Sequence, residues 1–218
     1  MKEHVLGSIR MTVVMTALLG FAYPAVVWGV GRLAFHDAAG GNLLRNEEGG
    51  RPGGIVGSSL IGQSFVMPGH FHGRPSGAGS GYDATASSPS NLGPTSKKLA
   101  DSVKDAVASV RTDEAITGAV PADAVTSSGS GLDPHISPEY ARLQIPRVAR
   151  ETKIPAADLE ALVARNTAGR FLGLYGEKAV NVLALNLAID GKLGHPQIAP
   201  TPTPTPVPTA TPAPASTP

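Results

Sequence analysis

The 218-residue chain contains no cysteine. This absence excludes disulfides, thiol catalysis and zinc sites with cysteine ligands, although it does not identify a cellular compartment. Aromatic residues make up only 5% of the chain, and they are not interleaved with basic residues in the way that proteins stacking on nucleic-acid bases require. The formal net charge is +1, so no strong field of one sign attracts polyanions. We therefore expect no nucleic-acid partner.

What the chain does have is one long uncharged stretch, Met11–Gly31 (MTVVMTALLGFAYPAVVWGVG), bracketed by Arg10 and Arg32. At a rise of ~1.5 Å per residue, a helix of this length covers the ~30 Å hydrocarbon core of a bilayer. A cleaved signal peptide is the alternative. Its apolar region is usually ~7–15 residues long and ends in a small-residue cleavage site, and this chain has neither feature. The sequence therefore predicts an uncleaved transmembrane helix over residues 11–32.

Basic residues around this stretch predict its orientation. Lys2 and Arg10 precede the helix together with the amino terminus, and Arg32 and Arg45 follow it. A short basic segment before the first helix favours an inside position, so residues 1–10 are expected in the cytoplasm. No second stretch of this kind follows, and we expect residues 33–195 to form one extracytoplasmic domain. The helix itself would be surrounded by membrane lipid.

Patterning in the middle of the chain predicts short strands and helices. Ile55–Val66 mixes β-branched and small residues, which indicates one or two short strands. The long polar segment 67–95 is expected to be an irregular loop packed by a few apolar side chains. In Lys97–Val110 the apolar residues recur at helical spacing, with Thr95 or Ser96 as the N-cap.

Three more helices are expected towards the carboxyl end. One begins after Ser137, with Pro146 ending or bending it, and another begins at Ile154-Pro155. The segment Val180–Ile189 fits both a helix and a strand, and we favour the helix. The predicted fold class is thus α/β (α+β), a soluble domain on a single N-terminal transmembrane helix.

Residues 196–218 differ from the rest of the chain, because proline alternates there with threonine and alanine. Such a sequence can build neither a core nor a hydrogen-bonded ladder, and it favours extended polyproline II. We interpret it as a spacer or a disordered tail that lies outside the fold.

A loop of small residues next to Asp133 is the first candidate site; its members are Ser127, Ser128, Gly129, Ser130 and Gly131. Backbone amides in such loops can cradle phosphate. However, the G-x-x-x-x-G-K-[ST] pattern is absent and no lysine or arginine is adjacent. We favour a structural turn, in which Asp133 and the serines satisfy nearby backbone groups.

The segment His70-Phe71-His72 is the second candidate, because two imidazoles at this spacing could bind a metal. No third ligand lies within a few residues, so we expect no metal site. Arg74 is expected to pair with a carboxylate or with loop carbonyls, and Asn91 to bond loop backbone or to face a partner. No serine has a histidine and an acid recognisably placed around it, so we expect no enzyme activity from the chain alone.

Several motifs together resemble the C subunit of the Kdp-type potassium-transporting ATPase. They are GSSLIGQSF with FHGRPS, then SPSNLGPTS, VTSSGSGLDPHISPEYARLQIPRVAR and VNVLALNLAID, together with the Tyr23-Pro24 pair in the membrane helix. The resemblance extends from about Arg10 to Asp190, in the family's order. The proline-rich tail departs from the family pattern.

The resemblance implies an accessory, non-catalytic subunit in the plasma membrane of a bacterial cell. Its expected partners are a potassium-translocating A subunit and an ATP-hydrolysing B subunit, with a small F subunit as a further one. The family subunit is needed for assembly and stability, and it has been described as a catalytic chaperone that raises the affinity of the B subunit for ATP. The alternative is a membrane-anchored surface protein whose proline-rich tail reaches the cell wall.

The resemblance also implies roles for individual residues. ATP is the one ligand that it suggests, with no cofactor bound firmly. Residues implied in nucleotide binding are Ser127, Ser128, Gly129, Ser130, Gly131, Asp133 and Gln144. Residues expected to face partner subunits are His72, Arg74 and Asn91.

Overall fold

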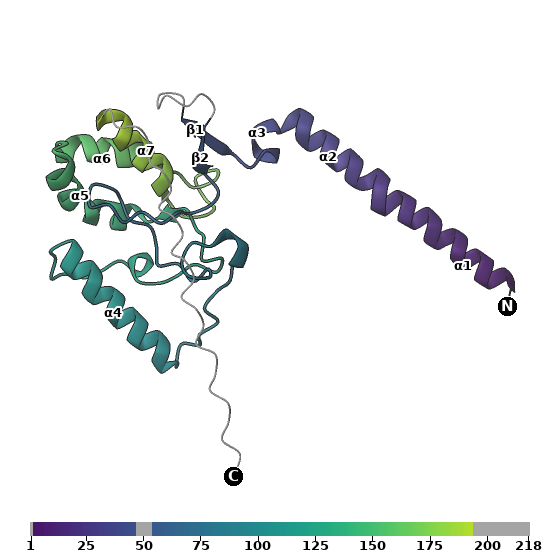
Figure 1. Cartoon of the computed structure of the whole chain (residues 1–218), viewed down its shortest axis with the longest axis horizontal. Helices are drawn as coiled ribbons and strands as arrows, with labels where there is room; N and C mark the ends of the chain where they lie inside the picture. Colours follow the sequence, from purple (N-terminus) through teal and green to yellow (C-terminus); the bar gives the residue numbers. More distant parts are fainter. Residues whose placement is uncertain (1, 47–53, 194–218) are drawn as a thin grey trace, which may run out of the picture. The chain divides into compact units, whose positions relative to one another are not determined.

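The structure is a computed structural model that describes residues 2–46 and 54–193 (Figure 1). The chain divides into two compact units, Met1–Leu43 and Leu44–Pro218, and each is described by itself. The predicted proline-rich tail lies outside the described residues, so its interpretation as a spacer stays a prediction.

The first unit is dominated by one continuous helical segment, made of α1 (Lys2–Met15), the π-helical η1 (Thr16–Ala22) and α2 (Tyr23–Ala34). The span Glu3–Ala34 has a mean hydropathy of 1.9, and in the described part of the chain it alone is long and apolar enough to cross a membrane. A short helix, α3 (His36–Ala39), follows. The predicted apolar helix is confirmed, although it begins at Lys2 rather than at Met11.

The π-helical turn lies directly before Pro24. The backbone N–H of Tyr23 donates to the carbonyl of Leu18, five residues back. Proline lacks an N–H, and its ring clashes with the carbonyl four residues earlier in a regular helix. A wider turn at this point lets the helix continue past the proline, as π-bulges do elsewhere.

Two small sheets lie in the second unit. In the first, β1 (Leu43–Asn46) pairs with β2 (Gly54–Ser58). The second is antiparallel in the order β3-β5-β4, formed by β3 (His135–Ile136), β5 (Ala179–Asn181) and β4 (Thr167–Ala168). Within it, Val180 lies opposite Ile136 on one side and Thr167 on the other. Of the predicted Ile55–Val66 strands, only β2 is formed.

Four longer helices complete the second unit: α4 (Lys97–Asp113), α5 (Pro138–Thr152), α6 (Ala156–Arg165) and α7 (Val182–Leu193). Single 3-10 turns, η2 (Ala84–Ala86) and η3 (Ala122–Ala124), lie in the loops. The side chains of Ser96 and Ser137 cap α4 and α5, as predicted from the sequence. In Figure 1, α5, α6 and α7 gather together and α4 is set apart from them.

Pro146 was expected to end or bend its helix, and it does not end it, because α5 continues to Thr152. Proline costs this helix one hydrogen bond, but the residues on either side of it, Ile145, Arg147 and Val148, are buried. Tertiary packing of such a face supplies most of the stability of a helix in a protein. The helix ends at Thr152, and the next residue, Lys153, adopts a left-handed conformation with φ of 62°.

The core of the second unit is built mainly by α5, α6 and α7 around β5. Its wholly buried apolar side chains include Phe71, Val148, Leu159, Val180, Leu185 and Ile189. Phe71 differs from the other core residues because it comes from the irregular segment 67–95 and not from a helix or strand. The expectation that this segment is packed and irregular is therefore confirmed.

Candidate functional site

Two side-chain amides hold the chain at Phe71 and His72. Asn186 of α7 accepts a hydrogen bond from the backbone N–H of Phe71 (2.8 Å) and donates to its carbonyl (2.9 Å). Gln144 of α5 accepts a hydrogen bond from the backbone N–H of His72 (2.7 Å) and donates to its carbonyl (3.0 Å). Both amides are completely buried. The segment is thus bonded on each side as a strand in a sheet would be, with side chains in place of neighbouring strands.

The geometry of an extended chain explains this arrangement. The N–H and C=O of one residue point to the same edge, and those of the next residue point to the opposite edge. Asn186 therefore satisfies one edge of the segment and Gln144 satisfies the other. Buried backbone groups left without partners are costly, so the two amides are needed wherever this segment enters the core.

Arg147 fixes the same segment from α5. Its guanidinium donates to the carbonyls of Pro68 and His70 and to the side chain of Gln144. It also forms a buried ion pair with Glu114, at 2.9 Å between Nε and Oε1. A buried charge needs such partners, and removal of one leaves the other uncompensated.

A second buried polar pair involves the carboxyl-terminal part of α7. The Nε2 atom of His70 lies 2.9 Å from Oδ1 of Asp190, and both side chains are buried. One oxygen of Asp190 and one of Glu114 have no hydrogen-bond partner within the described residues. Burial raises the pKa of Glu114 above its usual value, although the charge of Arg147 opposes this shift.

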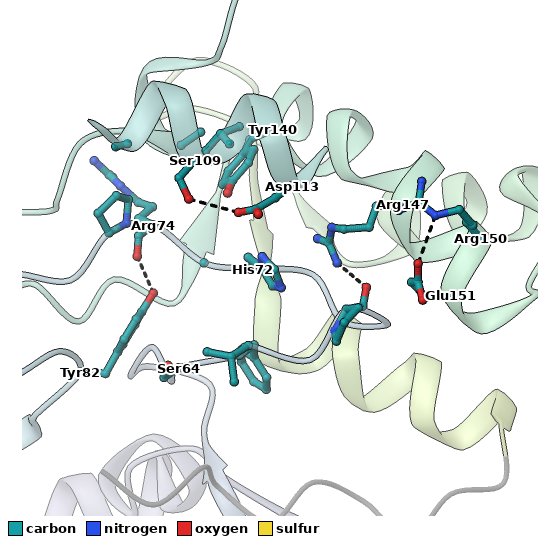
Figure 2. A pocket seen from close by; sticks show the side chains of 18 residues that line it. Ser64, His72, Arg74, Tyr82, Ser109, Asp113, Tyr140, Arg147, Arg150 and Glu151 are labelled. Atoms are coloured by element: carbon teal, nitrogen blue, oxygen red, sulfur yellow. Dashed lines mark hydrogen bonds and ion pairs between the residues drawn. The ribbon is translucent and has the colours of Figure 1, made fainter. Parts of the chain in front are cut away.

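A cavity of about 600 Å³ opens beside this scaffold, and Figure 2 shows the side chains around it. Its polar lining includes His72, Arg74, Tyr82, Asp113, Tyr140 and Arg150. Several of these groups are already engaged with the protein: Arg150 pairs with Glu151 at 3.1 Å, and Ser109 donates to Asp113 at 3.3 Å.

Burial shifts the pKa values of three side chains that line the cavity. The pKa of His72 is lowered, first by burial and then by the charge of Arg147. Burial also raises the pKa of Tyr82 to about 12, and the Tyr82 hydroxyl donates to the carbonyl of Arg74 at 2.6 Å. The pKa of Tyr140 is raised for the same reason. At neutral pH these three residues are therefore uncharged.

The loop from Ser127 to Asp133 packs against segment 73–90. Ser76 donates to the carbonyl of Gly131 at 2.6 Å, and Ser87 donates to that of Ser130 at 2.9 Å. Gly131 has φ of +69°, and a Cβ there would lie 2.6 Å from the backbone nitrogen of Ala78. This glycine is thus required by a left-handed conformation and by a close backbone approach.

Asp133 has partners on both carboxylate oxygens. Arg74 donates to one at 3.1 Å, and the backbone N–H of His135 donates to the other at 2.9 Å. Hydrogen bonding from the His135 side chain is the first of several causes that lower the pKa of Asp133. Arg74 also reaches the carbonyl of Thr126 at 3.3 Å, so its predicted pairing with a carboxylate and loop carbonyls is confirmed.

The structure joins some of the residues that the sequence singled out, Gln144 with His72 and Arg74 with Asp133. Gln144 is buried and its amide is used by His72 and Arg147, whereas Ser127, Ser128, Gly129 and Ser130 belong to the more accessible loop. His72 and Arg74 both line the cavity. Asn91 is exposed and has a left-handed φ of 51°.

Four residues of the buried scaffold were not singled out from the sequence: Glu114, Arg147, Asn186 and Asp190. For Asn186 and Asp190 the available signal was their polarity, at positions four apart, within the otherwise apolar stretch VLALNLAID. No group of three or more His, Asp or Glu side chains that could hold a metal occurs within residues 2–46 and 54–193.

Comparison with known proteins places these residues in a family context. The sequence model of the family described as "KdpC: K+-transporting ATPase, c chain" matches residues 5–191. A potassium-transporting ATPase KdpC subunit of Koribacter versatilis is 46% identical over 202 residues, covering 93% of this chain and all of that protein. The KdpC subunits of Gemmatimonas aurantiaca and Mycobacterium tuberculosis are each 48% identical to this chain and match 87% of it. The match covers 94% of the Gemmatimonas protein and 99% of the Mycobacterium protein.

Proposed function

The chain belongs to the KdpC family of K⁺-transporting ATPase subunits, and from this premise we propose that it is an accessory subunit without catalytic activity of its own. It would support assembly and stability of a complex with the potassium-translocating A subunit, the ATP-hydrolysing B subunit and a small F subunit. The observation that carries this proposal is the family match over residues 5–191, which includes both the membrane helix and the folded domain.

The use of the buried polar groups supports an accessory role over an enzymatic one. Arg147 bonds Glu114, Gln144 and the backbone of segment 68–72, and Gln144 also bonds the backbone of His72. Asn186 bonds Phe71 on the other side. These groups therefore act as scaffold, and they hold in place the segment that lines the cavity. A rigid domain of this kind suits a docking role.

The membrane helix is proposed to pack among helices of the partner subunits. Gly20, Ala22 and Ala25 are small, and small residues allow helices to approach closely in a membrane. A Cβ at Gly20 would meet only Thr16 Cγ2, at an ordinary 3.8 Å, so a Cβ there causes no clash within the helix. Any loss caused by bulk at this position must then come from a neighbouring molecule.

This gives a direct experiment. Gly20→Leu is expected to lower the amount of A and B subunits that co-purify with the chain after mild detergent extraction. Gly29→Leu is the matched control, since nothing lies within 4 Å of a Cβ at that position. Equal recovery of the partner subunits with Gly20→Leu and with the unchanged chain would contradict packing at this face.

We also propose that the amino terminus is inside and the folded domain outside the cell, which the basic residues before the helix support. The chain is free of cysteine, so single cysteines can report the side. Ser102→Cys should react with a membrane-impermeant maleimide in intact cells, whereas Ser8→Cys should react only after lysis. The reverse pattern would overturn this orientation.

Any effect on ATP is proposed to be indirect, through a conformational equilibrium shared with the B subunit. The loop Ser127–Asp133 would lie on the other side of the membrane from cytoplasmic ATP, and its groups already bond segment 73–90. Calorimetric titration of the full chain in detergent is expected to show ATP binding no tighter than about millimolar, at the weak end of affinity. Saturable micromolar binding that Asp133→Ala abolishes would instead assign nucleotide to this loop.

A further inference from the structure

The loop between β4 and β5 carries an exposed apolar tip, Phe171–Tyr175. Phe171, Leu172, Leu174 and Tyr175 are 71%, 75%, 77% and 68% exposed, and none of them belongs to the hydrophobic core. Soluble protein surfaces rarely keep large apolar side chains clustered in water unless they meet a partner or a membrane. We therefore expect a partner molecule or a membrane to cover this tip.

The backbone of this tip is ordered by its own hydrogen bonds. Phe171 and Tyr175 form a reciprocal pair, with N–H to carbonyl distances of 2.8 Å and 3.0 Å, and Leu174 also donates to Phe171. Leu172 adopts a left-handed φ of 52°, which is unfavourable for a residue with a branched side chain. The conformation nevertheless projects its leucine into solvent. A strained backbone that presents an apolar side chain is typical of a contact site.

The charged residues around the tip indicate what kind of partner covers it. Arg170 and Lys178 flank it on the two arms of the loop, Arg165 lies at the end of α6, and Glu177 is the one acidic residue between positions 165 and 178. All four charged side chains are exposed. Basic residues beside aromatic and leucine side chains fit the boundary of a bilayer that contains anionic lipid.

The chain also keeps the second compact unit close to a bilayer. Nine residues, 35–43, separate the end of α2 from the second compact unit. At ~3.3–3.6 Å per residue this connection can span at most about 35 Å. A lipid surface is thus always close to the domain, whereas a soluble partner would have to be recruited from solution.

We propose that the tip Phe171–Tyr175 inserts into the headgroup region of the bilayer on the domain's own side, with Arg170 and Lys178 contacting anionic lipid phosphates. Tyr175 carries a hydroxyl on an apolar ring, which suits this boundary. The contact goes beyond the accessory role proposed above, and it gives the domain a second attachment to the membrane besides the helix.

The test uses the full chain in vesicles without other subunits, so its outcome is independent of the proposed assembly role. A single cysteine, Leu174→Cys, is labelled with an environment-sensitive fluorophore, and Ser102→Cys on the exposed face of α4 is the matched control. In phosphatidylethanolamine–phosphatidylglycerol vesicles, the label at position 174 should shift its emission to the blue. It should also be quenched by brominated lipids, whereas the label at position 102 should not.

The role of charge is tested in the same vesicles. Each basic residue near an anionic surface contributes about fivefold to binding, so Arg170→Gln with Lys178→Gln should shift the tip towards its free state by roughly 25-fold. A label at position 174 that stays as water-exposed as the control in anionic vesicles overturns the proposal. So does a blue shift that appears only when the other subunits are added and without lipid quenching, because a protein surface would then be the occupant.

Discussion

Gln144 and Asn186 lie on opposite edges of one extended segment. The side-chain amide of Gln144 bonds both the N–H and the carbonyl of His72, and that of Asn186 bonds both groups of Phe71. The two amides come from different helices, α5 and α7. A segment with no neighbouring strand on either side is thereby bonded as fully as the central strand of a sheet.

We predict that Asn186→Leu destabilises the folded domain by about 2–4 kcal/mol, since two buried backbone groups lose their partners at about 1–3 kcal/mol each. Asn166→Leu is the control, because its half-buried amide bonds a single helix-end carbonyl, and it should cost about 1 kcal/mol or less. Urea unfolding of the full chain in detergent measures both. Equal losses in the two variants would contradict the special role of Asn186.

Arg147→Met should cost about 3–5 kcal/mol, because Glu114 is left as an uncompensated buried charge. Replacement of both partners, with Glu114→Leu added, should recover part of this loss. An exposed arginine of the same helix provides the comparison: Arg150→Met breaks only a surface pair and should cost less than about 1 kcal/mol. Failure of the double variant to recover any stability would point to the carbonyls of Pro68 and His70 as the dominant partners.

Two glycines of one loop are predicted to respond differently to valine. Gly131→Val should destabilise by roughly 2–4 kcal/mol, because its left-handed backbone and its contact with Ala78 both exclude a side chain. Nothing lies within 4 Å of a Cβ at Gly129, and Gly129→Val should change stability by less than about 1 kcal/mol. Thermal unfolding of both variants decides this. A stable Gly129→Val variant in which the ATP dependence of the complex is lost would favour the phosphate-cradle alternative.

The lowered pKa of His72 predicts a pH effect on stability. Its ordinary value is 6.5, so below that pH the unfolded chain binds a proton more readily than the folded protein. Stability contributed by neutral His72 is therefore present above about pH 6.5 and is lost as the pH falls towards the folded pKa. His72→Gln should show a smaller decrease in unfolding free energy between about pH 7.5 and about pH 5.5 than the unchanged chain. An identical decrease in both proteins would contradict the assignment to His72.

Deletion of residues 196–218 is predicted to leave assembly and potassium uptake intact. The family match ends at residue 191, and the tail has no apolar pattern that could join a core. Growth of a potassium-uptake-deficient strain at low potassium, with the truncated and full chains expressed equally, provides the measurement. A large loss of uptake on truncation would give the tail a role that its sequence does not predict.

Local features of this protein were predictable from sequence because their causes are local. Ser96 and Ser137 cap helices through hydrogen bonds that reach only three residues along the chain. The apolar run of the membrane helix likewise needs no tertiary context. Arg74 was assigned the correct kinds of partner from the chemistry of its guanidinium, although its carboxylate, Asp133, is 59 positions away.

The buried scaffold could not be predicted in the same way. Gln144 was singled out for nucleotide through the family resemblance, yet its amide lies against the backbone of His72. Asn186 and Arg147 find partners 115 and 77 positions away, and no pattern in one sequence states which distant backbone groups lack a partner. Whether Pro146 ends its helix could not be decided from sequence for a related reason, since the burial that keeps α5 continuous depends on the whole fold.

The side-chain bonding of segment 68–72 also has a consequence for the order of folding. Its bonds to α5 and α7 join residues between 72 and 120 positions apart. The entropy of closing such long loops must be overcome before any of these bonds forms, and chains dominated by distant contacts fold slowly. Helices α5 and α7 can form locally, but their amides find Phe71 and His72 only when the whole domain closes. The centre of this domain is therefore expected among the last parts to become ordered after the membrane helix has been inserted.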